Sequence, residues 1–345
     1  MNIKLLQEIC ETAGAPGFEN RIRKIVTREI KDLVDDIQID KMGNVIALKK
    51  GSKSKKVMIA AHMDEIGFIV THVDDKGFVR FHTLGGFDPK TLTSQRVIIH
   101  GKKDVVGVMG SKPIHLMQPE ERNKAPQLSD YYIDLGMSKK EVDKLVIPGD
   151  AVTRERSFIE MGDCFNCKSL DNRISVFILI EALRLLKKPC YDTYAVFTVQ
   201  EEVGLRGAYV AAHQIDPDFG FGLDTTIAFD TPGAQAHEKV TELGKGVAIK
   251  IMDGGTICDH RMIAFMKDMA EKNKITHQME VLPAGSTDTA GIQRMGKTGA
   301  IAGAVSIPTR HIHSVIEMVH KKDVSNAISL LNFCLLNLDK NKWTF

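Results

Sequence analysis

The sequence Val57-Met-Ile-Ala-Ala61-His62-Met-Asp64-Glu65 joins an unbroken apolar run to a cluster of polar residues. An apolar run without alternation is typical of a strand that is buried on both faces of a parallel sheet. Further runs of this kind alternate with segments that have the apolar repeat of helices, and this alternation predicts an α/β layer fold. The further runs are residues 194–199, 219–223 and 300–307, and the helical segments are residues 169–188 and 287–295.

The chain ahead of residue 57 has two helical patterns and one hairpin pattern. Apolar residues recur near the helical spacing at Leu5, Leu6 and Ile9, and again from Ile22 to Leu33. Residues 36–39 and 45–48 read as the strands of a hairpin around a Met-Gly-Asn turn. We expect residues 51–56 to be a polar connector.

A second domain is predicted within the first. Residues 70–158 break the strand and helix alternation with short alternating strands and turn signals at residues 74–77 and 100–103. We therefore expect an inserted β domain at residues 70–158 and a main domain made of residues 1–69 and 159–345. Inside the insertion, Ser138-Lys-Lys-Glu141 predicts a capping box that opens one short helix.

Composition excludes several classes of protein. The 345 residues are 43% hydrophobic and carry a net charge of only +2, which favours neither nucleic acid nor an anionic membrane as a partner. We find no run of about 18 apolar residues and no signal-peptide pattern. The six cysteines are sparse, as expected for reduced thiols. A cytoplasmic location is the expectation.

Polar residues follow each of the four apolar runs, and in open α/β sheets the ligand site lies beyond the carboxyl ends of the strands. Imidazoles mixed with carboxylates suit zinc, cobalt or manganese better than magnesium or calcium, and the lack of thiolates argues against a structural zinc site. A shared carboxylate can bridge two metals roughly 3.5–4 Å apart. The residues expected to converge are His62, Asp171, Glu202, Asp224 and His313.

Glu201 stands directly before Glu202, and adjacent carboxylates repel each other unless a cation or separate tasks keep them apart. A metal ligand beside a general base satisfies that condition. A glycosidase, which also uses paired acids, is disfavoured because neighbours on a strand point to opposite faces.

At these residues the sequence resembles the tetrahedral aminopeptidases, a family that includes glutamyl and deblocking aminopeptidases and some members labelled endoglucanases. The resemblance spans essentially the whole chain. It implies a three-layer α/β/α domain with a mixed, mostly parallel sheet, and an inserted small β-barrel-like domain that forms dimers. The motifs that carry it are Ala61-His-Met-Asp-Glu-Ile-Gly-Phe68, Lys168-Ser-Leu-Asp-Asn-Arg173, Gln200-Glu-Glu-Val-Gly204, Leu223-Asp224, Gly285-Ser-Thr-Asp288 and Arg310-His-Ile-His-Ser314.

The resemblance also implies a role for each candidate residue. Asp171 would bridge two divalent metals, zinc or cobalt with manganese as a further option. His62 and Asp224 would complete one metal site, and Glu202 and His313 the other. The remaining implied roles are Asp64 as the residue that orients His62, Glu201 as the general base that deprotonates a metal-activated water, and Thr287 and Asp288 as substrate-binding residues.

The implied reaction is removal of the N-terminal residue from short peptides, and the implied assembly is a dimer that builds a twelve-subunit tetrahedral particle. A dipeptidase, deacylase or carboxypeptidase with the same chemistry stays open, as does a metal-binding scaffold without turnover. The intact Glu201 argues against the scaffold, because a scaffold needs no general base. The residue preference is left undecided.

Three other motifs are assigned to structure rather than chemistry. Residues 291–298 match the phosphate-loop pattern, but a helix precedes them and a strand follows, the reverse of a working phosphate loop. Cys164 and Cys167 lack a second cysteine pair and are expected to be buried free thiols. Glu317 and His320 have helical spacing, and we expect them on a solvated helix face.

Overall fold

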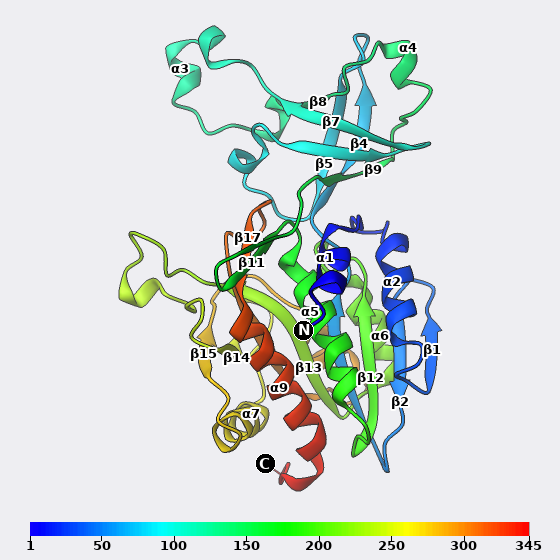
Figure 1. Cartoon of the computed structure of the whole chain (residues 1–345), viewed down its shortest axis with the longest axis vertical. Helices are drawn as coiled ribbons and strands as arrows, with labels where there is room; N and C mark the ends of the chain where they lie inside the picture. Colours follow the sequence, from blue (N-terminus) through cyan, green and yellow to red (C-terminus); the bar gives the residue numbers. More distant parts are fainter. Residues whose placement is uncertain (345) are drawn as a thin grey trace.

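The computed structural model describes residues 1–344. In this range an 11-stranded mixed sheet lies between two helical layers, and a closed β-barrel stands at one end of the main domain (Figure 1). The α/β fold with an inserted barrel is therefore confirmed. Within the described residues, no helix is both long and apolar enough to cross a membrane.

Parallel pairing occupies the middle of the large sheet. Strands β12, β3, β13 and β16 lie side by side and all run parallel, whereas the strands on either side of them pair antiparallel. The carboxyl ends of the four central strands therefore meet at one edge. The strands are β1 (Asp36–Ile39), β2 (Val45–Lys49), β12 (Tyr191–Thr198), β3 (Lys53–His62), β13 (Phe219–Ile227), β16 (Ile301–Arg310), β17 (Glu317–His320), β11 (Cys164–Cys167) and β10 (Ile159–Met161), with β14 (Val247–Met252) and β15 (His277–Val281) branching from β16.

Burial of β3 on both faces explains its unbroken apolar sequence. Successive side chains of a strand point to opposite faces, and here Val57 and Ile59 join the core cluster under α1, α2, α5, α7 and α9, whereas Met58 and Ala60 join the cluster under α6 and α8. The helices of the main domain are α1 (Ile3–Glu11), α2 (Asn20–Ile30), α5 (Leu170–Leu185), α6 (Arg206–Ile215), α7 (His260–Lys272), α8 (Thr289–Met295) and α9 (Lys321–Asn337).

Three expectations about individual helices and strands were wrong. The polar residues from Lys53 onward extend β3 instead of forming a connector, because an exposed strand end tolerates lysines. Strand β13 continues to Ile227, so Asp224 lies inside a strand and not beyond it. Glu317 and His320 lie on β17, not on a helix, and Glu317 is fully buried.

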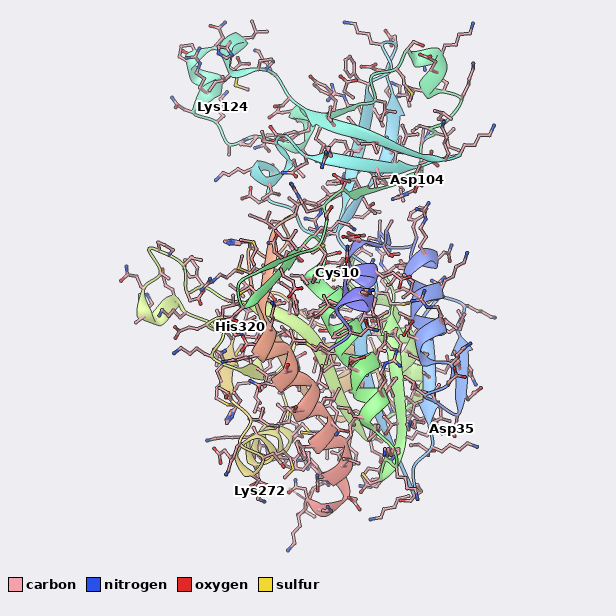
Figure 2. The ribbon with its side chains drawn as sticks, viewed as in Figure 1. Cys10, Asp35, Asp104, Lys124, Lys272 and His320 are labelled. Carbon is pink, nitrogen blue, oxygen red and sulfur yellow. The ribbon has the colours of Figure 1, made fainter. Side chains whose placement is uncertain are left out.

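The barrel has its own apolar core around Phe68, Val97 and Ile133. The expected capping box is present, since the Ser138 backbone and hydroxyl donate to Glu141 at the start of α4 (Lys139–Val142). Figure 2 shows Asp104 on the barrel side that faces the main domain and Lys124 at the far end of the barrel. The barrel strands, in order around it, are β4 (Gly67–Val73), β5 (Val79–Leu84), β8 (Tyr132–Asp134), β7 (Asp104–Gly110), β6 (Arg96–His100) and β9 (Ala151–Arg154), and α3 (Pro119–Arg122) lies in a loop.

Candidate metal centre

The structure brings the five predicted metal ligands together at the carboxyl edge of the central strands. His62 is the last residue of β3, Asp224 lies in β13, and Glu202 follows β12. His313 follows β16, and Asp171 lies at the non-helical start of α5. Since four different strands end at this edge, residues far apart in the sequence become neighbours.

Two groups of donor atoms share Asp171. His62 Nε2 lies 3.4 Å from Asp171 Oδ1 and 3.6 Å from Asp224 Oδ1. His313 Nε2 lies 3.4 Å from Asp171 Oδ2 and 3.5 Å from Glu202 Oε2. The two oxygens of one carboxylate therefore face two different imidazoles.

These separations fit ligands of a common ion. Two donors, each about 2.0–2.2 Å from a tetrahedral zinc, lie about 3.3–3.6 Å from each other. Asp171 Oδ1 and Glu202 Oε1 are buried and have no hydrogen-bond partner among the described residues, and buried carboxylate oxygens are rarely left in that state. The donor set therefore suits metal ions, and His62, Asp171 and Glu202 offer one ligand atom each within a 4.8 Å cluster.

The charge balance of the site also favours cations. Burial raises the pKa of Glu202 to about 8, and the negative charge of Asp171 adds to the shift. Burial disfavours a charged His313, but Asp171 and Glu202 outweigh it and raise the pKa of His313 to about 10. Four carboxylates surround two imidazoles here, so divalent cations would neutralise the excess negative charge and displace the protons.

Glu201, the predicted general base, lies beside the first group. Its Oε2 is 3.7 Å from His62 Nε2. Glu201, His62 and Asp224 also offer one possible ligand atom each within 4.8 Å of one another. Burial raises the pKa of Glu201 well above its ordinary value, an effect that His62 opposes and Asp224 reinforces. A raised pKa suits a group that takes up and returns a proton near neutral pH.

Asp64 is fully buried and contacts three of the candidate site residues. Its carboxylate accepts the backbone N–H groups of Glu201 and Glu202, both at 3.1 Å. His62 Nδ1 lies 3.2 Å from the Asp64 carbonyl oxygen and 3.5 Å from its carboxylate. Asp64 therefore contacts His62 mainly through its backbone, and its side chain positions the two glutamates.

A cavity of about 430 Å³ opens beside the candidate ligands. Thr287 lines it and donates a hydrogen bond to Asp253, which in turn contacts the buried Lys250. Asp288 is buried behind the cavity, where it accepts a hydrogen bond from Thr198, and burial raises its pKa to about 7. Of the two predicted substrate-binding residues, only Thr287 lines the cavity.

Glu317 is the site residue that the sequence analysis missed. Its Oε2 accepts the backbone N–H of Asp171 at 2.8 Å, and its Oε1 accepts that of His313 at 3.0 Å. The residue thus ties together the shared carboxylate and an imidazole of the second group. Glu317 to His320 reads polar, apolar, apolar, polar, which is not the alternation of a half-buried strand, so the sequence carries no signal against the helical spacing.

Comparisons with known proteins identify the family of the chain. A family model described as M42 glutamyl aminopeptidase matches residues 43–330. The lysyl aminopeptidase of Pyrococcus furiosus is 35% identical over 99% of either chain. The solved aminopeptidase APDkam598 of the archaeon Desulfurococcus kamchatkensis is 39% identical, with a TM-score of 0.93 over 97% of this chain and 94% of that one.

A second solved structure bears on assembly. The Pyrococcus horikoshii TET1 peptidase, described as able to form a tetrahedron or a large octahedral shell, is 32% identical, with a TM-score of 0.86 over 97% of this chain and 99% of that one. The resemblance drawn from the sequence motifs is confirmed. The chain belongs to the M42 glutamyl aminopeptidase family and is a hydrolase of the aminopeptidase class.

Proposed function

We propose that the protein is a two-metal aminopeptidase that removes the N-terminal residue from short peptides. The observation that carries the proposal is the placement of Asp171, whose two oxygens face His62 and His313 at 3.4 Å each. A bridging carboxylate between two sets of ligands is the arrangement used by two-metal hydrolases. Zinc or cobalt is the proposed metal, with manganese as a further option.

Each ligand has a proposed place. His62 and Asp224 would hold one cation with Asp171, and Glu202 and His313 would hold the other. Glu317 fixes the backbone of Asp171 and His313, and Asp64 fixes that of Glu201 and Glu202. Hydrogen-bonded partners of this kind orient ligands and increase metal affinity.

Glu201 is the proposed acid and base of the reaction. Metal ions at this centre supply Lewis acidity, which lowers the pKa of water and polarises a peptide carbonyl. Glu201 takes the proton from the attacking water and delivers it to the leaving amine. The free N-terminal amine of the peptide docks beside the carboxylates, so that only the first peptide bond reaches Glu201.

Hydrolysis of chromogenic aminoacyl substrates tests the proposal. Chelator-treated enzyme is assayed before and after addition of zinc, cobalt or manganese, with N-acetylated substrates as controls. Metal-restored cleavage of free-amine substrates alone is the expected result. Equal cleavage of acetylated substrates would show that no free amine is needed and would contradict the aminopeptidase proposal, and no cleavage would favour a dipeptidase, a deacylase or a non-catalytic metal protein.

We also propose that the barrel mediates self-association, first into a dimer and then into a twelve-subunit tetrahedral particle. The proposal is supported by the Pyrococcus horikoshii relative, which can assemble into a tetrahedron, and by exposed apolar side chains on the barrel of this chain. Large apolar side chains in water often mark a contact surface. They are Val106, Val108, Ile114 and Leu116.

A further inference from the structure

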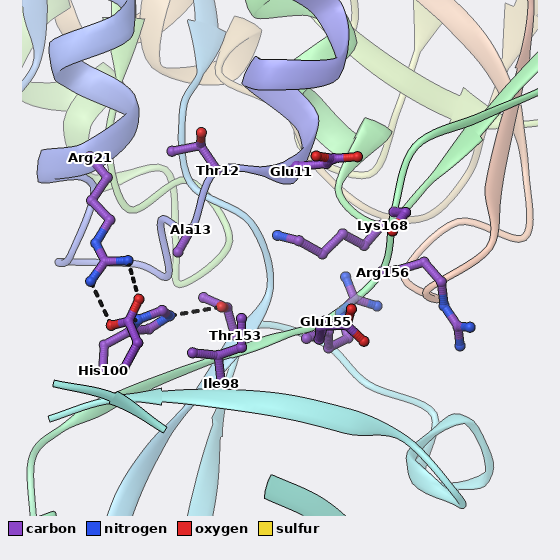
Figure 3. A pocket seen from close by; sticks show the side chains of 13 residues that line it. Glu11, Thr12, Ala13, Arg21, Ile98, His100, Thr153, Glu155, Arg156 and Lys168 are labelled. Carbon is purple, nitrogen blue, oxygen red and sulfur yellow. Dashed lines mark hydrogen bonds and ion pairs between the residues drawn. The ribbon is translucent and has the colours of Figure 1, made fainter. Parts of the chain in front are cut away.

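A second cavity lies between the barrel and the main domain, and it is separate from the cavity beside the metal ligands. Its volume is about 300 Å³, and none of its lining residues lines the cavity beside the metal ligands. Figure 3 shows Glu11 and Thr12 on its main-domain side, and Ile98 and Thr153 on its barrel side. The proposed function does not use this cavity.

Two cations in the wall of this cavity have carboxylate partners. Arg21 binds Asp104 through two hydrogen bonds of 2.6 Å (Figure 3). Lys168 donates to both oxygens of the buried Glu65, at 2.8 and 2.6 Å. The charges of Arg21 and Lys168 are therefore compensated within the chain.

Arg154, the last residue of β9, has no such partner. Its side chain is 3% exposed, and Nε and Nη2 are buried without a hydrogen-bond partner. One face of the guanidinium lies over the ring of Phe87, with 5.6 Å between Cζ and the ring centroid. Among residues 1–344, no carboxylate lies within ion-pair distance of Arg154, although a buried guanidinium is normally paired; its charge acts only at longer range on Glu317, where it opposes the rise of the pKa that burial causes.

Arg156 adds a second cation with spare donors. Its Nη2 donates to Gln95 at 3.3 Å, and its Nε is buried without a partner. The carboxylate between these two arginines in the sequence, Glu155, pairs with Arg96, with 2.8 Å between Glu155 Oε2 and Arg96 Nε. Two guanidinium groups that line the cavity, those of Arg154 and Arg156, therefore have N–H donors without a hydrogen-bond partner among the described residues.

We infer that this cavity is a binding site for a small oxyanion, a carboxylate or a phosphate, held by the guanidinium of Arg154 with Arg156 beside it. A guanidinium offers parallel N–H groups that match two oxygens of such an anion. The cavity volume lies at the lower end of the range for ligand pockets, roughly 300–1,000 Å³, which restricts the ligand to a small acid or inorganic phosphate.

The position of the site gives the bound anion a structural consequence. Arg154 belongs to the barrel, and Glu11 to Ala13 on the opposite wall belong to the main domain. A ligand that binds only the folded protein raises its stability as the ligand concentration rises. The anion would therefore stabilise the junction of the two domains, whether or not the enzyme is turning over.

Anion binding to the zinc-loaded enzyme tests this inference. Acetate and inorganic phosphate are titrated separately by calorimetry against a chloride buffer of constant ionic strength, and the thermal unfolding midpoint is followed in parallel. Wild type and R122M are compared with R154M. Arg122 is a matched control because it lies on α3, next to Lys124 at the far end of the barrel (Figure 2).

The expected result is saturable binding of acetate, phosphate or both to wild type and R122M, and binding at least about tenfold weaker in R154M. Binding of acetate alone would identify the ligand as a carboxylate, and binding of phosphate alone would identify it as a phosphate. Equal binding to R154M and wild type would place the anion elsewhere, for instance on the metals, and would overturn the inference, as would no binding to wild type.

A structural measurement keeps the inference testable if R154M does not fold. Crystals of the wild-type enzyme are soaked in selenate, a tetrahedral oxyanion whose selenium can be located by anomalous scattering. A peak beside the Arg154 guanidinium supports the site. Peaks only at other positions, or no peak, would refute it.

Discussion

Glutamine in place of Glu201 keeps the shape of the side chain and removes its capacity to accept a proton. We expect E201Q to lose about 10²- to 10⁴-fold in kcat, the usual contribution of a general base. Metal content measured by atomic absorption should stay at the wild-type level. In the comparison variant E202Q, by contrast, we expect metal to be lost, because Glu202 Oε2 lies among the ligand atoms. Near-normal turnover of E201Q would refute the base assignment.

Protons and metal ions compete for the same residues. In the metal-free protein, the pKa of His313 is raised to about 10 and that of Glu202 to about 8, so both groups hold protons at neutral pH. These protons must leave before the metal binds, and a lower pH retains them.

We therefore expect the apparent metal affinity to rise with pH through neutrality, until the pH passes the raised pKa values of Glu202, about 8, and His313, about 10. Calorimetry in buffers of different ionisation enthalpy should show proton release on zinc binding. The H313A variant should release fewer protons. An affinity that does not change with pH would contradict this account of the site.

At the scale of elements, β17 connects two parts of the centre. Glu317 on β17 accepts the N–H groups of Asp171 at the start of α5 and of His313 in the segment after β16. Glutamine at this position places an amide N–H against one of these donors. We expect E317Q to bind zinc about 10- to 100-fold more weakly, as is typical when a residue that orients metal ligands is changed.

Added metal should restore the activity of E317Q, because the ligands themselves are intact. E160Q on β10, which β11 separates from β17, is the control, since Glu160 is exposed and pairs with Lys321. The zinc affinity of both variants is measured by adding zinc in steps to the metal-free protein and recording the activity at each step. Unchanged metal affinity in E317Q would show that β17 does not position the ligands.

At the scale of the whole molecule, the barrel carries the proposed assembly surface. Val106 and Val108 are 58% and 48% exposed on β7. Glutamates at both positions should leave the barrel fold intact, because the side chains already face water, but should repel a second copy. We expect V106E/V108E to give smaller particles than wild type in light scattering.

Circular dichroism serves as the folding control for V106E/V108E. A second control is K76E, a charge change in the exposed turn between β4 and β5. If V106E/V108E and wild type have the same particle mass, the contact surface lies elsewhere on the chain.

Much of the fold could be predicted because burial leaves a direct mark on composition. Residues 57–61 are apolar without interruption, since β3 is covered on both faces. The same principle located β12, β13 and β16, and the polar residues next to these runs indicated the ligand set. The bounds of β3 and β13 were wrong because hydrogen bonding can continue where the apolar pattern ends.

The sequence by itself determined the alternation of the central strands with helices, the identities of the proposed metal ligands and the family, because these depend on local apolar patterns and on short motifs, each of a few consecutive residues. Only the tertiary structure decided that Glu317 is buried at the metal centre and that Arg154 is unpaired between the domains. Both facts depend on which residues from distant segments lie opposite a side chain. The type of a charged residue does not tell whether its side chain faces water, an ion-pair partner or a cavity.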